Sequence, residues 1–215
     1  MLAPSSLMLI ASRAHLTLVA SGTPRQLTDR ELVESLLARE PTAAALVWRK
    51  YSPRVFGMVQ RTFGSVVDAE DTTQEVFLRV FSRVHTLRDP DALSAFIVSV
   101  AIRVIRWQLR QRAVRKIMQL VDEPPEVSVP GLDMEARSTL RRFYEVLDTL
   151  GTEDRVIFAL RHLEGMTVAE VAGATGSSLS TVKRRLTRAS ERLAQRVGND
   201  PTLMGYAARV TGHAD

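Results

Sequence analysis

The chain has 215 residues, with 29 lysines and arginines against 24 aspartates and glutamates, which gives a formal net charge of +5. A basic balance favours an anionic partner without saying which one. Cysteine is absent and the four histidines are scattered, which excludes a disulfide framework and a thiolate metal site. We therefore expect no metal, no cofactor and a reducing, cytoplasmic setting.

Residues 1–26 form an N-terminal extension to which we assign no function. Their apolar cluster is interrupted by Arg13 and His15, and no basic segment precedes it, so a secretory signal is not expected. We also expect that no stretch approaches the ~20 apolar residues that a membrane span needs. The sequence thus predicts a soluble protein without membrane insertion.

Residues 27–118 are predicted to be a first helical domain. Apolar residues at helical spacing indicate one helix from Thr28 to Pro41 and a second in which Pro53 is a site for a kink. A turn at Gly64 then leads into a third helix that starts near Asp68, where acids favour the positive end of the helix dipole.

The third helix carries two stripes. One is apolar and predicted to be buried, and it includes Phe77. The other, at i, i+3, i+4 and i+7, combines acids, an amide and a leucine: Asp71, Gln74, Glu75 and Leu78. From spacing alone this second stripe is either a docking surface for a basic partner or an ordinary solvated face.

The fourth helix is predicted at residues 95–116 and has six basic residues and no acid. Its apolar stripe runs through Val98, Ile102, Ile105 and Leu109. The other side combines guanidinium groups with one aromatic ring: Arg103, Arg106, Trp107 and Arg110. This mixture suits a separated DNA strand, whose bases stack on aromatics while cations follow the phosphates. The alternative is that Trp107 belongs to the core and the arginines only solvate the helix.

Residues 119–136 are predicted to be a flexible linker, because prolines at positions 124, 125 and 130 interrupt the helical pattern. A second domain at 137–198 and a C-terminal tail at 199–215 follow. The predicted fold is therefore all-α, with two small helical domains joined by this linker.

The second domain contains a predicted helix-turn-helix. Thr167 and Glu170 match a capping box, Gly176 ends the first helix and Ser178 is placed to cap a longer second one. The exposed face of the second helix is strongly basic, and it begins with small polar residues that can approach base edges. Its candidate DNA contacts are Ser180, Thr181, Lys183, Arg184, Arg185 and Arg188. The alternative is a basic amphipathic hairpin that only faces solvent.

The ordered combination resembles an extracytoplasmic-function (ECF) sigma factor of the sigma-70 family. The resemblance rests on Asp-Ala-Glu-Asp-Thr-Thr-Gln-Glu-Val-Phe-Leu-Arg at 68–79, the apolar and basic helix up to Lys116, the proline-bearing linker, Leu-Asp-Thr-Leu at 147–150 and the Thr-Val-Lys of the helix-turn-helix. It covers about residues 28–197 and implies two conserved modules, region 2 and region 4.

The resemblance also implies roles. The helix with Asp71, Gln74, Glu75, Phe77 and Leu78 would bind the beta-prime clamp helices of core RNA polymerase, and region 4 would lie at the beta flap and read the promoter −35 element. The loop 86–94 and the following helix would bind and melt the −10 element through Arg88, Phe96, Arg103, Arg106, Trp107 and Arg110. The polymerase does all the chemistry, so no catalytic residue is expected. An anti-sigma factor is the expected regulator.

Two other classes stay open at this point. A one-component regulator would use residues 28–120 as a sensing or dimerising domain below a helix-turn-helix. A nucleic-acid-processing enzyme would use the acids at 68–71 as metal ligands, although these lie within one helical turn and lack a partnering acidic cluster.

Overall fold

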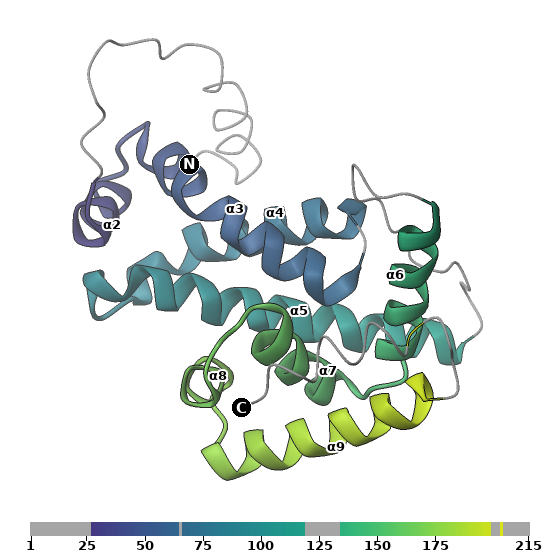
Figure 1. The fold of residues 1–215 in the computed structure, drawn as a ribbon. Helices are drawn as coiled ribbons and strands as arrows, with labels where there is room; N and C mark the ends of the chain where they lie inside the picture. The colour runs from purple at the N-terminus through teal and green to yellow at the C-terminus, as the bar shows by residue number, and fades with distance from the viewer. Residues whose placement is uncertain (1–26, 65, 119–133, 199–202, 204–215) are drawn as a thin grey trace.

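The computed structural model describes residues 27–64, 66–118, 134–198 and 203. Every element within these residues is helical and none is a strand. Figure 1 shows α5 crossing the middle of the molecule, with α3 and α4 on one side and α7, α8 and α9 on the other. The all-α prediction with two helical domains is confirmed.

The elements follow the order expected from the sequence. The first domain consists of α2 (Asp29–Leu37), α3 (Ala43–Phe63), α4 (Val66–Arg83), the short 3₁₀ turns η2 (Val84–Thr86) and η3 (Pro90–Ala92), and α5 (Leu93–Ile117). The second domain consists of α6 (Met134–Leu147), α7 (Thr152–Phe158), the π-helical turn η4 (Ala159–Leu163), α8 (Val168–Thr175) and α9 (Leu179–Val197).

Local chemistry explains where α2 and α3 begin and end. Thr28 and Glu31 form a full capping box at the start of α2. Pro53 lies inside α3, which continues through it. Gly64 ends α3 in the left-handed region at φ 81°, and a Cβ there would come within 2.5 Å of the Tyr144 ring. Two features therefore require glycine at this position: the left-handed backbone and the close contact with Tyr144 of the second domain.

The core does not divide cleanly between the domains. The larger cluster is built on α2 to α5, but six residues of the second domain belong to it too: Val156, Ile157, Leu160, Val171, Ala172 and Val182. A smaller cluster gathers other residues of the second domain around Leu147, and Leu203 packs into it from beyond α9. The predicted linker at 119–136 lies mostly outside the described residues. Among the described residues, the two domains pack directly on each other.

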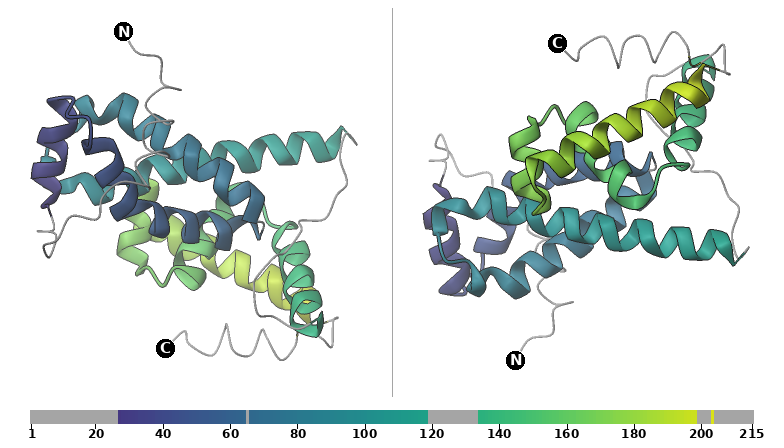
Figure 2. Two further views of the ribbon diagram at one scale, coloured as in Figure 1. Left: turned by 90° about the horizontal axis from the view of Figure 1, so that it is seen from above. Right: turned by 90° about the horizontal axis from the view of Figure 1, so that it is seen from below.

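The expectation about membrane spans is wrong for one segment. Residues 90–115 are long and apolar enough to cross a membrane, by length and composition only, with a mean hydropathy of 1.5. Half of that segment is buried inside the protein, because α5 has packing partners on two sides. Its apolar residues, such as Ile97 and Ile102, supply the core of a helical bundle. Both views in Figure 2 show the C-terminal turns of α5 extending past the other helices.

Candidate nucleic-acid interface

The helix-turn-helix is formed by α8 and α9, with the caps that the sequence predicts. Thr167 and Glu170 make a reciprocal capping box, in which the Glu170 carboxylate accepts from the Thr167 N–H at 2.8 Å. Gly176 ends α8 at φ 65°, and the Ser178 hydroxyl accepts from the Thr181 N–H at 3.2 Å. Each end of the turn is therefore fixed by its own hydrogen bonds rather than by distant packing.

Helix α9 is amphipathic as predicted. Its buried residues recur at helical spacing: Val182, Ala189, Leu193 and Val197. On the opposite face Ser180, Lys183 and Arg184 are exposed, and Thr181 is half-buried beside the Ser178 cap. These exposed side chains stand at the N-terminal end of the helix, the part of a recognition helix that approaches base edges.

A buried carboxylate holds α9 against α7. The Asp154 side chain is only 3% exposed and accepts from Arg185 Nη1 at 2.9 Å and from Arg188 Nε and Nη2 at 2.8 and 2.6 Å. Burial raises the pKa of Asp154, but the hydrogen bonds and charges of the two arginines outweigh it and hold that pKa below its ordinary value. The bidentate pair with Asp154 likewise raises the pKa of Arg188.

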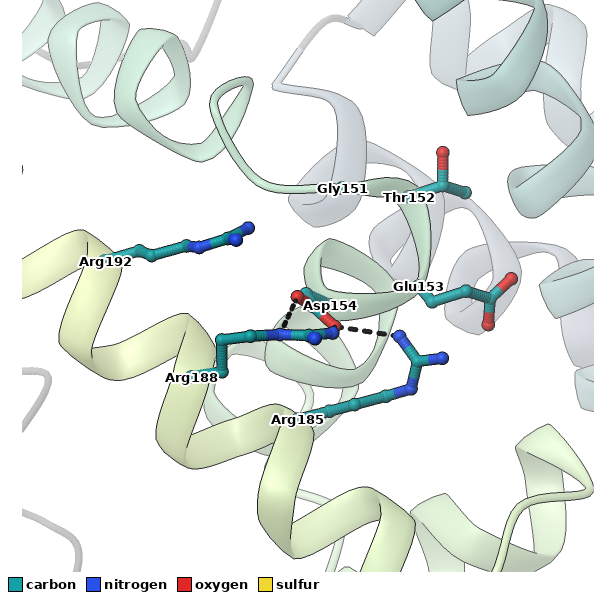
Figure 3. A pocket seen from close by; sticks show the side chains of 7 residues that line it. All are labelled: Gly151, Thr152, Glu153, Asp154, Arg185, Arg188 and Arg192. Atoms are coloured by element: carbon teal, nitrogen blue, oxygen red, sulfur yellow. Dashed lines mark hydrogen bonds and ion pairs between the residues drawn. The ribbon is translucent and has the colours of Figure 1, made fainter.

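Figure 3 shows these arginines on one side of an open pocket of about 280 Å³ between α7 and α9. Arg192 also lines this pocket, and Glu153 points away from the Asp154 pair. Arg185, which the sequence predicts to contact DNA, turns its guanidinium inward to Asp154 in this structure. Arg188 is half-exposed, and its Nε and Nη2 both donate to the Asp154 carboxylate.

The outer face of α5 exposes some of the residues that were predicted to contact DNA. Arg103 is exposed and Trp107 is 48% exposed, so the alternative of a core tryptophan is wrong. The Arg79 guanidinium lies over the Trp107 ring at 5.7 Å from its centroid. Of the other predicted residues, Arg88 is exposed and Phe96 is partly buried against the core.

Two other arginines of α5 are engaged by the second domain. Arg106 is 17% exposed, and its Nη2 lies 2.9 Å from Glu153 Oε2. Arg110 Nη2 lies 2.9 Å from Glu153 Oε1. The structure therefore corrects the expectation that Arg106 is available to DNA in this conformation, because its guanidinium is covered by α7 and α8.

The acidic stripe of α4 is largely open. Asp71 and Gln74 are exposed, Leu78 is half-buried, and Glu75 accepts from Arg79 one turn further on at 2.6 Å. Phe77, which the resemblance placed among the partner contacts, is 0% exposed. The expectation of a direct contact by Phe77 is wrong, because its ring packs inward against Trp48, at a centroid distance of 4.8 Å, and against Phe81.

The loop between α4 and α5 is tied down by residues that the sequence reading did not single out. Asp29 accepts from Lys50 Nζ at 2.8 Å, from the Tyr51 hydroxyl and from the Ser94 N–H at 3.2 Å. Arg30 pairs with Asp91 at 2.5 Å. The Thr-x-x-Glu signature at 28–31 could have located the start of α2, but no local signal shows that Asp29 reaches Ser94, 65 residues away.

The comparisons agree with this arrangement. Residues 47–115 match the sequence model of sigma-70 region 2, and residues 140–193 match that of sigma-70 region 4. The ferric citrate uptake sigma factor FecI of Escherichia coli K12 is 32% identical over 136 residues, which cover 61% of this chain and 77% of FecI. The ECF RNA polymerase sigma factor SigE of Mycolicibacterium smegmatis is 27% identical over 207 residues, covering 83% of this chain and 76% of SigE.

Two solved structures share the fold. CnrH, in complex with the cytosolic domain of CnrY, is 21% identical with a TM-score of 0.56, covering 80% of this chain and 98% of CnrH. The sigma factor RpoE in complex with the anti-sigma factor NepR, from Bartonella quintana, is 19% identical with a TM-score of 0.54, covering 72% of this chain and 96% of that one.

The fold and the two matched regions define a transcription initiation factor with no enzymatic activity of its own. The chain belongs to the sigma-70 family, as an ECF sigma factor. The first domain is its region 2 and the second its region 4. Among the described residues, no group of three or more histidine or acidic side chains is placed to hold a metal ion.

Proposed function

We propose that this sigma factor binds core RNA polymerase, directs it to promoters through a −35 and a −10 element, and helps to melt the DNA there. The observation that carries the proposal is the pairing of an exposed basic recognition helix in region 4 with an exposed arginine and tryptophan face in region 2. Neither face has a catalytic constellation, and both suit nucleic acid.

Region 4 is proposed to read the −35 element in the major groove through α9. Ser180 is the residue nearest the N-terminal end among the exposed candidates, so it is suited to a base edge. Lys183 and Arg184 are exposed and have no ion pair among the described residues, so their charge is available to phosphates or to guanine. Asp154 positions this helix by holding Arg185 and Arg188.

Region 2 is proposed to bind the −10 element along α5. Trp107 offers a half-exposed ring on which an unpaired base can stack, and the nearby Arg79 and Arg103 supply cations for the phosphates. Arg88 and the loop around it are proposed to hold a flipped base of the non-template strand, a function that loop rigidity favours. Asp29 and Arg30 provide that rigidity.

The exposed stripe of α4 is proposed as the contact with the beta-prime clamp helices. Asp71 and Gln74 present an acid and an amide to a partner, with the Glu75–Arg79 pair and Leu78 beside them. An anti-sigma factor is proposed as a regulator, since the solved RpoE chain was crystallised with NepR. A protein that works with RNA polymerase acts in the cytoplasm, which is our proposed location.

Run-off transcription with purified core polymerase over a genomic fragment library tests this function. We expect discrete start sites with the wild-type chain and loss of most product for the Lys183→Ala, Arg184→Ala double variant. The matched control is Arg196→Ala, which removes an exposed cation from the far end of the same helix. If the chain bound duplex DNA tightly by itself and initiated nowhere with polymerase, a one-component regulator would be the better reading.

The polymerase contact has its own test. Asp71→Ala with Gln74→Ala should weaken binding to core polymerase by at least tenfold, whereas Glu34→Ala, an exposed acid on α2, should leave it unchanged. An equal effect of both changes would show that only net charge matters and would remove α4 as the docking site.

A further inference from the structure

The first residue of the recognition helix is an exposed leucine. Leu179 begins α9, and 52% of its surface is accessible to solvent. It is one of the few large apolar side chains that the described residues leave exposed. Single apolar residues on a protein surface are common and need no explanation by themselves. Leu179, however, stands at the end of the helix that approaches base edges in a helix-turn-helix.

Packing within the protein does not account for Leu179. The buried stripe of α9 starts three residues later with Val182, which is 0% exposed, and Leu186 packs against the same core. Within the described part of the chain, Leu179 belongs to neither apolar cluster. Helical side chains tilt toward the N-terminus of their helix, so the side chain of a first residue extends beyond the helix end. The apolar surface of Leu179 is therefore offered outward.

The hydroxyl groups around Leu179 are bonded to one another. The Ser178 hydroxyl accepts from the Thr181 N–H at 3.2 Å and lies 2.9 Å from the Thr181 hydroxyl. The Ser180 hydroxyl lies 3.0 Å from that of Ser178. These bonds fix the first turn of α9. Leu179 is thereby presented on a rigid turn whose hydroxyl groups already have partners.

Thymine presents an apolar group at the place where this end of α9 would lie. In the major groove an A·T pair shows the C5-methyl group of thymine, and apolar side chains recognise that group by contact. The edge of a cytosine or a guanine offers polar atoms instead, which would lose water against a leucine without gaining a hydrogen bond. A leucine at this position therefore favours thymine and disfavours the other bases.

We propose that Leu179 is a specificity residue of region 4 that contacts the C5-methyl group of a thymine in the −35 element. The inference rests on the proposed function and adds to it one base and the side chain that reads it. Exposed cations such as Lys183, one turn further along α9, strengthen binding to the phosphates of any sequence. Leu179 instead distinguishes one base by apolar contact.

The first test removes the methyl group from the DNA. Deoxyuridine differs from thymidine only by that group, so each thymine of the −35 element, on either strand, is replaced by it in turn. The affinity of holoenzyme, assembled with core polymerase, is measured for each duplex of a promoter from the run-off screen. The wild type should bind about fourfold more weakly at one replaced thymine, the effect of one methyl group that is no longer buried.

Leu179→Ala removes the other side of the contact. The variant holoenzyme should bind the unmodified promoter at least about fourfold more weakly, and it should no longer distinguish thymine from deoxyuridine at that position. The matched control is Lys183→Ala, which should weaken binding to both duplexes and keep the difference between them. Because Leu179 is exposed, its replacement should leave the fold unchanged, which circular dichroism checks.

Leu179→Gln tests the same contact by a change of preference. Glutamine pairs with the N6 and N7 atoms of adenine in the major groove. When promoters are selected from a library randomised over the −35 element, the wild type should enrich thymine at the position found with deoxyuridine. Leu179→Gln should lose that thymine and enrich adenine there, with the other positions unchanged. A variant that still enriches thymine at that position would contradict the assignment.

The outcomes separate this inference from the proposed function. A wild-type holoenzyme that is indifferent to deoxyuridine at every thymine, or a Leu179→Ala holoenzyme that keeps the wild-type difference, overturns the role of Leu179. A −35 element without thymine on either strand has the same consequence. All three results leave the sigma function intact. If the wild type fails to initiate anywhere with core polymerase, the proposed function fails and the inference falls with it.

Discussion

Regions 2 and 4 each contain one sheltered aspartate that joins distant elements, but the two carboxylates have different partners. Asp29 in region 2 accepts from Lys50, from the Tyr51 hydroxyl and from a backbone N–H. Asp154 in region 4 accepts only from the guanidinium groups of Arg185 and Arg188. Helix α9 is thus held by charge, whereas the loop between α4 and α5 is held by a mixed network.

The hydrophobic cores of regions 2 and 4 also differ. Region 2 contributes most of the larger cluster, with many fully buried aliphatic and aromatic side chains. Region 4 has a smaller cluster of its own, to which Leu203 also belongs. Several other apolar residues of region 4 pack into the larger cluster of region 2. The comparison suggests that region 2 depends mainly on apolar burial, and that region 4 depends more on ion pairs and on its neighbour.

The largest expected effect is on the region 2 core. Phe77→Ala should lower the free energy of unfolding by about 3–5 kcal/mol, because it removes a fully buried ring and leaves a cavity. Chemical denaturation followed by circular dichroism measures this. Gln74→Ala on the exposed side of the same helix should change stability by less than about 0.5 kcal/mol. A small effect of Phe77→Ala would contradict the view that apolar burial dominates region 2.

The next effect should fall on region 4. Asp154→Asn keeps the shape of the side chain but removes the charge that holds two arginines, and it should cost about 1–3 kcal/mol. Amide hydrogen exchange should show faster opening of α9 than of α4. A uniform increase in exchange over both regions would mean that Asp154 stabilises the whole molecule rather than the recognition helix.

Asp29 and Asp154 should both contribute to the loss of stability in acid, each in its own region. Burial raises the pKa of each, yet their hydrogen bonds leave both pKa values in the folded protein below the ordinary 3.8. A lowered folded pKa gives stability that is complete above the unfolded value and is lost as the pH falls below about 4. Asp29→Asn and Asp154→Asn should each flatten the fall in unfolding free energy between about pH 5 and pH 2.

When amide hydrogen exchange is followed over the same pH range, Asp154→Asn should make the opening of α9 less dependent on acid. Asp29→Asn should do the same for the opening of the α4–α5 loop. The partners of Asp29 are Lys50, Tyr51 and the Ser94 N–H, and those of Asp154 are the two arginines of α9. If neither change altered the slope, other carboxylates would be responsible for acid unfolding.

The smallest expected effect is at an exposed pair. Arg30 and Asp91 lie 2.5 Å apart with about half of each side chain in solvent, so Arg30→Ala should leave the unfolding transition almost unchanged. Run-off transcription should then report whether the loop itself matters. A loss of initiation with little loss of stability would show that Arg30 positions the loop for DNA.

Local patterns were sufficient for the elements and their ends. The capping residues Thr167 and Ser178 and the turn at Gly176 act within four residues of themselves, so the sequence displays them directly. The buried stripe of α9 and the exposure of Gln74 follow from helical spacing. The order of motifs was enough to indicate the sigma-70 family, which the matches to regions 2 and 4 confirm.

Sequence spacing was misleading where a residue's partner is far away in the chain. Arg106 and Trp107 are neighbours on one predicted face, yet the first is covered by region 4 and the second is half-exposed. Arg185 was predicted to contact DNA from its charge, and the pattern does not show the buried Asp154 with which its guanidinium pairs. Helix α5 is long and apolar enough to resemble a membrane span by length and composition only. In the folded chain its apolar residues are buried by helices on two sides.

By itself the sequence determined the all-α class, the helix-turn-helix with its caps, the basic faces and the family. These depend on hydrogen bonds and periodicities within a few residues, which a linear chain displays. Only the tertiary structure decided that region 4 packs on region 2, that Glu153 holds Arg106 and Arg110, and that Arg155 closes the end of α3. Those contacts join residues about 40 to 90 positions apart, and burial and charge pairing at such separations arise only when the chain is folded.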